Sequence, residues 1–136
     1  MKKVLFLLTI AILAVSCNRS EAVLFAAKTQ ANAQCPMVLD EITTLKNVVY
    51  DIGDSFFIYN YTINETICPM SAVKDQIETL AENVKSTVDT PANQVFLAAC
   101  AKANVKILFQ YSGSESGEMC WITYDPNNKT TTVKRE

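Results

Sequence analysis

Hydrophobic residues recur at steps of three and four along the stretch 71–89, and charged or polar residues fill the positions between them. The recurring positions are Val73, Ile77, Leu80, Val84 and Val88. This spacing puts them on one face of a helix, so the stretch predicts an amphipathic α-helix. A second helix is expected over 92–103, after a cap and a first-turn proline at Thr90 and Pro91. An alanine-rich helix is expected over 20–34, before Pro36 ends it.

Other segments are rich in β-branched and aromatic residues, which favours strands. Strands are expected over 42–50 and 55–63, over 105–112 and 119–124, and as a short edge over 130–134. The order α-β-β-α-α-β-β predicts an α+β domain, in which an antiparallel sheet of four to five strands carries helices on one face.

The stretch 55–63 is apolar on both of its faces. Because side chains alternate along a strand, one face carries Phe57, Tyr59, Tyr61 and Ile63, and the other carries Phe56, Ile58, Asn60 and Thr62. The pattern leaves open which face meets the core.

Residues 1–16 have the pattern of an export signal. Lys2 and Lys3 precede an apolar run over 4–15, and a small residue, Ser16, precedes Cys17. As a helix the run would rise about 18 Å, short of the roughly 30 Å bilayer core, so it does not predict a permanent membrane span. We expect a lipoprotein signal peptide over 1–16, a lipidated N-terminus and short spacer over 17–19, and a single α+β domain over 20–136.

The stretch 13–17, Leu-Ala-Val-Ser-Cys, resembles the lipobox of bacterial lipoproteins. In that class the cysteine, here Cys17, takes a diacylglycerol thioether, and its freed amine is acylated by a fatty acid such as palmitate. The leucine stands one place earlier than usual, a relaxed form familiar in Bacteroides-like organisms. Asn18 replaces the aspartate associated with inner-membrane retention, which implies an outer-membrane lipoprotein facing the periplasm; the cell surface is the alternative location. The competing interpretation is an ordinary signal peptide with an incidental Cys17.

Composition narrows the function classes. The chain has a formal net charge of −2 and no histidine. A mildly acidic chain lacks the basic surface that nucleic acid requires, so we expect no nucleic-acid partner. Without histidine there is no Ser–His–Asp or Cys–His site and no histidine-containing zinc site. We therefore expect no metal and no cofactor, and an enzyme is the weaker expectation.

Four cysteines remain besides Cys17, and they are Cys35, Cys68, Cys100 and Cys120. In an oxidising compartment they permit two disulfides, in any of three connectivities. The alternative is that they are free and buried, where cysteine behaves as a small apolar residue. No two of them share a C-x-x-C spacing, which disfavours a thiol redox protein and a four-thiolate zinc site.

The stretch 34–45, with the sequence QCPMVLDEITTL, and the later Tyr59-Asn60-Tyr61 resemble a group of small, uncharacterised secreted proteins and lipoproteins of Gram-negative bacteria. That group shares a P-M-x-x-D-x-x-T-x-L segment, a Y-x-Y strand, and a later cysteine, helix and strand. The resemblance covers most of 34–124 and implies no activity. Within it, Asp40 and Glu41 with Thr43 are the candidates for a shared surface; the alternative is that Asp40 or Thr43 hydrogen-bonds a turn.

Two functions are consistent with these features. The first is a non-catalytic binding or interaction module, anchored to the membrane through Cys17 and contacting an envelope protein or peptide. Tyr59, Tyr61 and Trp121 would add aromatic contacts to its surface, although aromatic residues on a sheet are more often core. The alternative is a small carboxylate-dependent envelope enzyme, with Asp40 and Glu41 near Asp51 or Asp54.

Overall fold

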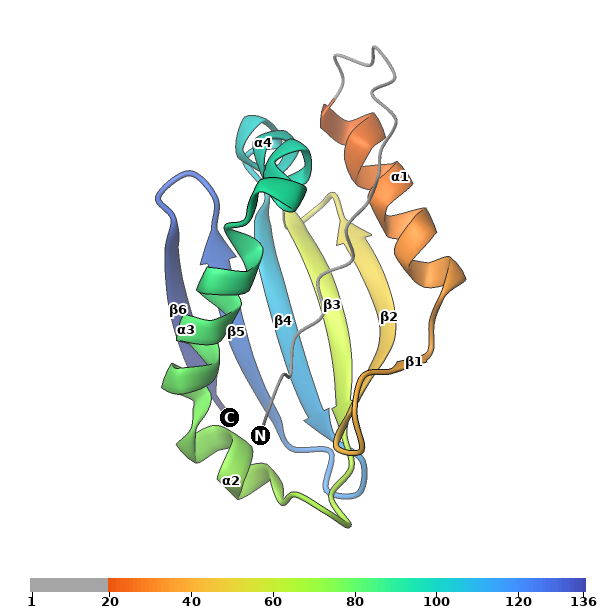
Figure 1. The fold of residues 1–136 in the computed structure, drawn as a ribbon, viewed down its shortest axis with the longest axis vertical. Helices are drawn as coiled ribbons and strands as arrows, with labels where there is room; N and C mark the ends of the chain where they lie inside the picture. The colour runs from red at the N-terminus through yellow and green to blue at the C-terminus, as the bar shows by residue number, and fades with distance from the viewer. Residues whose placement is uncertain (1–19) are drawn as a thin grey trace.

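A six-stranded sheet with helices on one face forms the part of the chain that the computed structural model describes, residues 20–136 (Figure 1). The elements in chain order are α1 (Ser20–Ala33), β1 (Met37–Val38), β2 (Thr43–Asp51), β3 (Phe56–Ile63), α2 (Met70–Asp75), α3 (Ile77–Val88), the 3₁₀ turn η1 (Pro91–Asn93), α4 (Gln94–Ala103), β4 (Lys106–Gly113), β5 (Met119–Asp125) and β6 (Thr130–Arg135). The expected export signal and Cys17 lie outside the described residues.

The predicted α+β class is confirmed, but the number, direction and order of the strands differ from the prediction. The sheet has six strands rather than four to five, and it is mixed, because β3 and β4 run parallel while the other neighbours are antiparallel. The helices between β3 and β4 carry the chain back to the end of the sheet where β3 began, so β4 enters in the same direction. The extra strand β1 comes before the first predicted strand, the one over 42–50, and its two residues are too few to show alternation.

The helix expected over 71–89 is divided into α2 and α3 at Gln76. The backbone of Gln76 leaves the helical region (φ −105°, ψ 12°), and its N–H is shared between the carbonyls of Ala72 and Val73, at 3.3 and 3.1 Å. In Figure 1, α3 lies along β5 and β6, whereas α2 lies near one end of the sheet. The predicted apolar face is nevertheless correct, because Val73, Ile77, Leu80, Val84 and Val88 are all buried.

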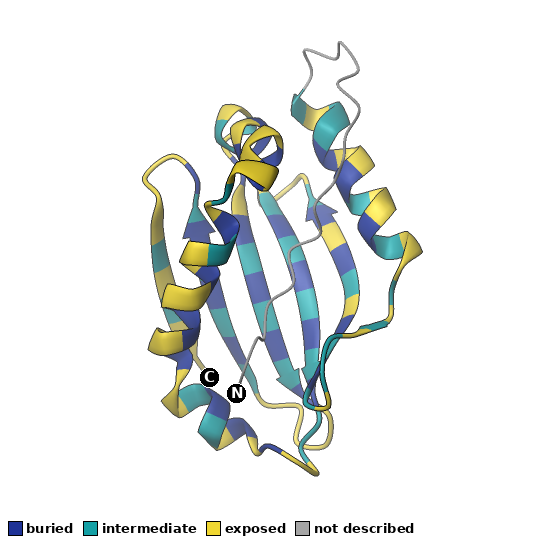
Figure 2. Ribbon diagram, in the orientation of Figure 1, coloured by how far each residue is buried: buried dark blue, intermediate teal, exposed yellow. Residues whose placement is uncertain are grey.

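The face of the sheet under the helices supplies the core. In β3, Phe57, Tyr59, Tyr61 and Ile63 are buried and the residues between them are half-buried, which decides the choice that the sequence left open (Figure 2). Aromatic rings stack across the parallel pair of strands: Tyr59 lies 5.3 Å from Phe109 and Tyr61 lies 4.9 Å from Tyr111, between ring centroids. Offset stacking of this kind adds to the stabilisation from burial alone.

Specific contacts attach α4 and α1 to this layer. Phe96 of α4 packs edge-on against Phe57, with centroids 4.8 Å apart, and Phe25 of α1 packs edge-on against Tyr50 at 5.2 Å. The Asn32 side chain of α1 donates to the carbonyl of Val48 at 2.5 Å and accepts from its N–H at 2.8 Å. Asn32 thus satisfies the edge of β2 beyond the point where β1 ends. Among residues 20–136, no helix has the length and apolar character needed to cross a bilayer.

Gly113, at the end of β4, gives a test of the packing. An added Cβ would lie 2.5 Å from Cδ of Glu65 and 2.7 Å from Cγ of Met70, so Gly113→Ala should lower the free energy of unfolding by about 1–3 kcal/mol in a urea titration. Gly53 is the matched control, because its added Cβ would meet only Asp51 Oδ1, at 3.5 Å. Equal losses at both glycines would contradict this account.

Candidate functional site

The residues proposed from the sequence as a contact surface do not lie together. The Asp40 carboxylate accepts from the N–H groups of Ile42 and Thr43, at 2.8 and 2.7 Å, so it closes a turn before β2. Glu41 is exposed and Thr43 is buried. Tyr59 and Tyr61 are buried under the helices, whereas Trp121 lies on the opposite face of the sheet.

The tyrosines under the helices belong to the core. Burial raises the pKa of Tyr61 and of Tyr111, so both phenols stay protonated. Their buried hydroxyl oxygens have no hydrogen-bond partner among the described residues. Such unpaired groups usually lower stability, whereas the stacking of the Tyr61 ring on the Tyr111 ring raises it.

The four cysteines of the described chain are free thiols, as in the second of the two alternatives raised by the sequence. Cys68, Cys100 and Cys120 are buried, and Cys35 is half-buried with Sγ donating to the Ala31 carbonyl at 3.2 Å. Burial raises the pKa of Cys100 to about 12 and that of Cys120 to about 11. Thiols of this kind are largely un-ionised and poorly nucleophilic near neutral pH.

The carboxylates suggested for an enzyme are far apart. Asp40 and Glu41 precede β2, and Asp51 and Asp54 lie at its other end, about 25–30 Å away for a strand of this length. Between residues 20 and 136, no group of three or more His, Cys, Asp and Glu side chains is arranged to hold a metal ion.

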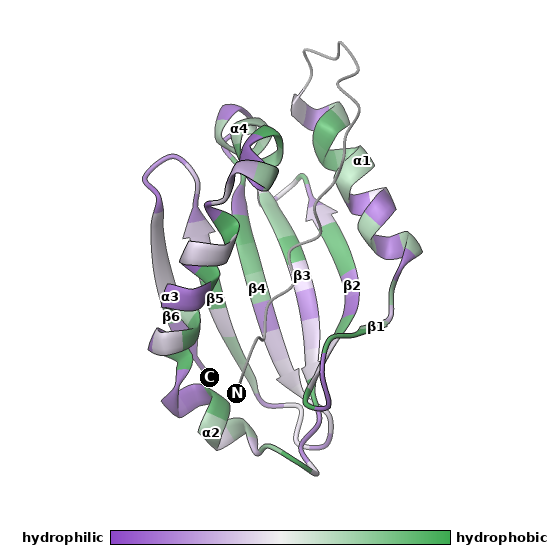
Figure 3. Cartoon of the chain, in the orientation of Figure 1, coloured by the Kyte–Doolittle hydropathy of each residue, from purple (hydrophilic) through white to green (hydrophobic). Residues whose placement is uncertain are grey.

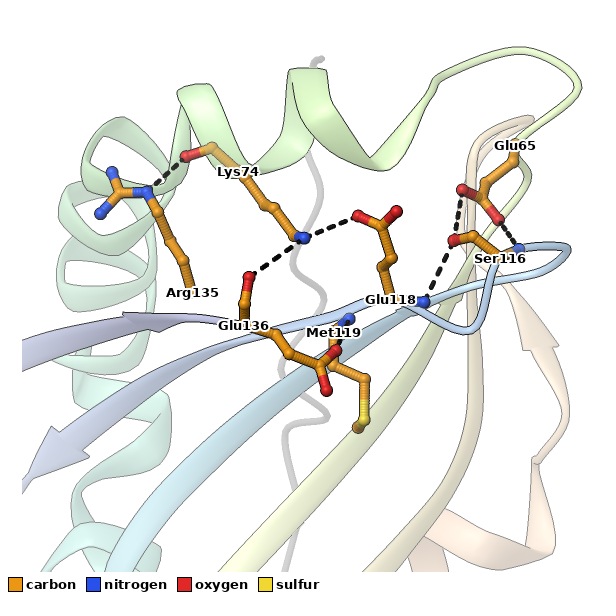
Figure 4. A network of polar contacts seen from close by, with 7 residues as sticks. All are labelled: Glu65, Lys74, Ser116, Glu118, Met119, Arg135 and Glu136. Carbon is orange, nitrogen blue, oxygen red and sulfur yellow. Dashed lines mark hydrogen bonds and ion pairs between the residues drawn. The ribbon is translucent and has the colours of Figure 1, made fainter.

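A polar network near α2 joins the loop between β4 and β5 and the end of β6 to the helices (Figure 4). Glu65 accepts from the N–H groups of Ser116 and Glu115, at 2.6 and 2.7 Å, and from the Ser116 hydroxyl at 2.8 Å. Lys74 pairs with Glu118 at 2.6 Å, and Arg135 donates to the Lys74 carbonyl at 3.0 Å. These are mostly exposed contacts between parts of the same chain, so we interpret the network as a structural clamp.

The face of the sheet opposite the helices, here called the open face, carries the most ordered arrangement of polar side chains. The strand register aligns its residues in rows that run across the sheet. The polar row consists of Asn47, Asn60, Gln110, Trp121 and Lys134, one residue from each of β2 to β6. On one side of it lies an aliphatic row of Val49, Ile58 and Leu108, and on the other side a hydroxyl row of Thr44, Thr62 and Ser112.

Hydrogen bonds connect the polar row from strand to strand. The Trp121 indole N–H donates to Gln110 Oε1 at 2.8 Å, Gln110 Nε2 donates to Asn60 Oδ1 at 2.8 Å, and Asn60 Nδ2 donates to Asn47 Oδ1 at 2.7 Å. At the other end, Lys134 Nζ lies 5.2 Å from the centroid of the Trp121 ring, within cation–π range. All four side chains of the hydrogen-bonded chain are half-buried.

The indole sets the direction of this chain. An indole N–H can only donate, so Gln110 must turn its oxygen toward Trp121 and its nitrogen toward Asn60. Asn60 must then accept from Gln110, and it donates onward to Asn47. The orientation of each amide therefore follows from the indole N–H. The side chains of the row are held in place by hydrogen bonds within the chain itself.

Sequence reasoning identified only Trp121 in this row. Asn60 and Gln110 each interrupt a strand of apolar and aromatic residues, visible as hydrophilic bands in β3 and β4 in Figure 3. That interruption is the signal in the sequence. The contact between Asn60 and Gln110 depends on the parallel pairing of β3 with β4, and the sequence did not predict that pairing.

Comparison with known proteins places the chain in a family. A family model described as "Domain of unknown function (DUF8479)" matches residues 19–120. The chain belongs to this family. The match takes in Asn47, Asn60 and Gln110, and it ends one residue before Trp121. No curated protein matches the chain significantly.

One solved structure has a similar fold. It is a crystal structure from Pseudomonas aeruginosa, described as that of a "putative secreted protein (PA3611)", with a TM-score of 0.60 and 8% sequence identity. The alignment covers 85% of this chain and 88% of that one. At this identity the likeness concerns the fold alone. The sequence resembles a group of small, uncharacterised secreted proteins. A family without an assigned function and a structural neighbour described as secreted agree with that part of the resemblance.

The clamp at Glu65 predicts a dependence of stability on pH. The backbone N–H of Ser116, followed by that of Glu115, lowers the pKa of Glu65 below its ordinary value. A carboxyl group with a lowered folded-state pKa contributes stability above its unfolded pKa and loses it as the pH falls through the folded value. The advantage of the wild type over Glu65→Gln in urea unfolding should therefore be present at pH 7 and shrink below about pH 4.5.

The control for this measurement is Glu115→Gln, which removes a charge from the same loop without removing the acceptor. It should not reproduce the pH-dependent difference. A Glu65→Gln variant whose deficit is the same at pH 7 and pH 3 would contradict the role given to the carboxylate.

Proposed function

We propose that this chain is a lipid-anchored protein of the bacterial cell envelope, a non-catalytic binding module that meets its partner through the open face. The anchor is lipid on Cys17, and the location is the outer membrane with the domain in the periplasm. The basic, apolar and small-residue pattern that ends at Cys17 supports export and lipidation. The secreted structural neighbour is consistent with a location outside the cytoplasm.

The distribution of charge on the open face carries the binding proposal. The aliphatic and hydroxyl rows are uncharged, and so is the polar row from Asn47 to Trp121. Charged residues stand at the margins of this area, and these are Lys46, Asp51, Lys106, Asp125 and Lys134. An uncharged centre containing tryptophan and surrounded by charge is the usual anatomy of a contact surface.

The order of the polar row also favours binding. Each amide is held by its neighbours, so little side-chain freedom remains to be lost when a partner docks. Pre-organisation of this kind raises affinity by lowering the entropic cost of association. A face that served only to meet water would need no such order.

The anchor is tested by replacing its cysteine. In Triton X-114 partition, wild-type protein should enter the detergent phase, and mass spectrometry should find diacylglycerol on Cys17. Cys17→Ser should move to the aqueous phase or stay as uncut precursor, because no thioether can form. Cys35→Ser is the control, since it removes a thiol from the domain and should still partition with detergent. A fully processed Cys17→Ser protein in the detergent phase would overturn the assignment.

The binding face is tested by photo-crosslinking in intact cells. The crosslinker p-benzoylphenylalanine at position 49, an open-face residue that is 40% exposed, should give adducts with an envelope component. Placed at position 95, which is 59% exposed on α4, it should give none. Adding Leu108→Lys should abolish the adducts at position 49, because it puts a charge in the uncharged centre. Adducts that form equally at position 95, or persist with Leu108→Lys, would refute the assignment of this face.

A further inference from the structure

We propose that the ligand of the open face is an uncharged, polyhydroxylated chain, that is, a neutral segment of an envelope glycan lying along the polar row. This inference rests on the proposed function and names its partner by chemistry. The residues that would meet the glycan are Asn47, Asn60, Gln110 and Trp121.

The first argument is the hydrogen-bonding capacity left on the row. Each primary amide has two N–H donors and an oxygen that accepts two bonds. Within the row, Asn60 and Gln110 each use one N–H and one lone pair, and Asn47 uses only one lone pair. Every amide therefore keeps at least one donor beside one acceptor. A sugar hydroxyl both donates and accepts, so it can bond to the two atoms of one amide at once.

The second argument is spacing. The amides stand on adjacent strands, so they repeat across the sheet about every 4.8 Å. This interval is close to the length of one pyranose unit in an extended glycan. Units of a β-1,4-linked chain are turned over in alternation, so equivalent hydroxyls on one side recur at every second unit, or about every second strand. Asn47 and Gln110 would thus meet equivalent hydroxyls, and Asn60 would meet the groups of the unit between them.

The third argument is the surroundings of the row. Trp121 offers aromatic surface of the kind that packs against the C–H groups of sugar rings, and its ring is held between Gln110 and Lys134. The hydroxyl row adds further neutral donors and acceptors on one side. The polar row contains no carboxylate, and its one cation, Lys134, stands at its β6 end. An ionic ligand would therefore find no counter-charge among the amides.

Size and shape argue against the two main alternatives. The open face across β2 to β5 measures about 20 Å by 25 Å, or about 500 Å², whereas a stable interface with a folded protein takes about 800 Å² from each partner. An extended peptide usually pairs with a sheet edge through its backbone, but the polar row is made of side chains and runs across the face, from strand to strand, rather than along an edge. A thin, flat polymer fits the area and the direction of the row.

The experiment uses the single tryptophan of the chain, Trp121, as a reporter within the row. The mature lipidated protein in detergent micelles is titrated with neutral hexasaccharides of β-1,4-linked glucose and of β-1,4-linked N-acetylglucosamine, and Trp121 fluorescence is recorded. We expect a saturable change with at least one of them. Gln110→Glu should weaken that binding about tenfold, because the carboxylate still accepts from Trp121 but has no N–H for Asn60 or the sugar.

Gln30→Glu is the matched control, an identical substitution at an exposed position of α1, and it should bind as the wild type does. The inference is overturned if neither neutral saccharide changes the fluorescence, if only acidic saccharides do, or if Gln110→Glu binds as well as the control. Crosslinks to a protein from position 49 without saccharide binding would overturn the glycan and leave the proposed function standing. The absence of both saccharide binding and crosslinks from position 49 would overturn the glycan inference and the proposed binding function together.

Discussion

The parallel pairing of β3 with β4 is the constraint on which the rest of the structure depends. Its register sets Tyr59 beside Phe109 and Tyr61 beside Tyr111 under the helices, and it sets Asn60 beside Gln110 on the open face. Because side chains alternate, a slip of one residue would turn the side chains of the slipped strand to the other face and would break every one of these pairs. The stacked rings stabilise this register on the helix side of the sheet, and the hydrogen bond between Asn60 and Gln110 stabilises it on the open face.

The parallel pair exists because the helices between the two strands lie on one face. Parallel strands need a long crossover, and here α2, α3 and α4 provide it and cover the aromatic layer as they do so. The antiparallel neighbours β2 and β5 then extend the same rows outward. The two faces of the sheet therefore have different roles. The helix side supplies most of the hydrophobic stabilisation, and the open face is not covered by any helix of the described residues.

The sequence predicted what depends on local pattern and missed what depends on register. The spacing of Val73 to Val88 predicts one helix face, and the five recurring residues are buried as that face requires. The stretch 55–63 predicts a strand, but both of its faces are apolar, so the pattern leaves the buried face open. No glycine or proline lies near Gln76, so the sequence gives no sign that the helix is divided there. Asn60 and Gln110 are fifty positions apart, and their contact follows only from a strand pairing that the sequence was expected to make antiparallel. Tyr59 and Tyr61 were grouped with Trp121 as aromatic residues, although the pleat puts them on opposite faces.

The one-way donation that begins at the indole N–H gives the open face a polarity. Every bond in the row points from β5 toward β2, so the amide dipoles add rather than cancel. The Asn47 end therefore presents two unused N–H groups, while the Trp121 end is closed by a ring and an ammonium group. A molecule lying across these strands would meet different chemistry at its two ends. A polymer bound as proposed would therefore bind differently in its two directions along the row, which a symmetric patch of the same composition would not cause.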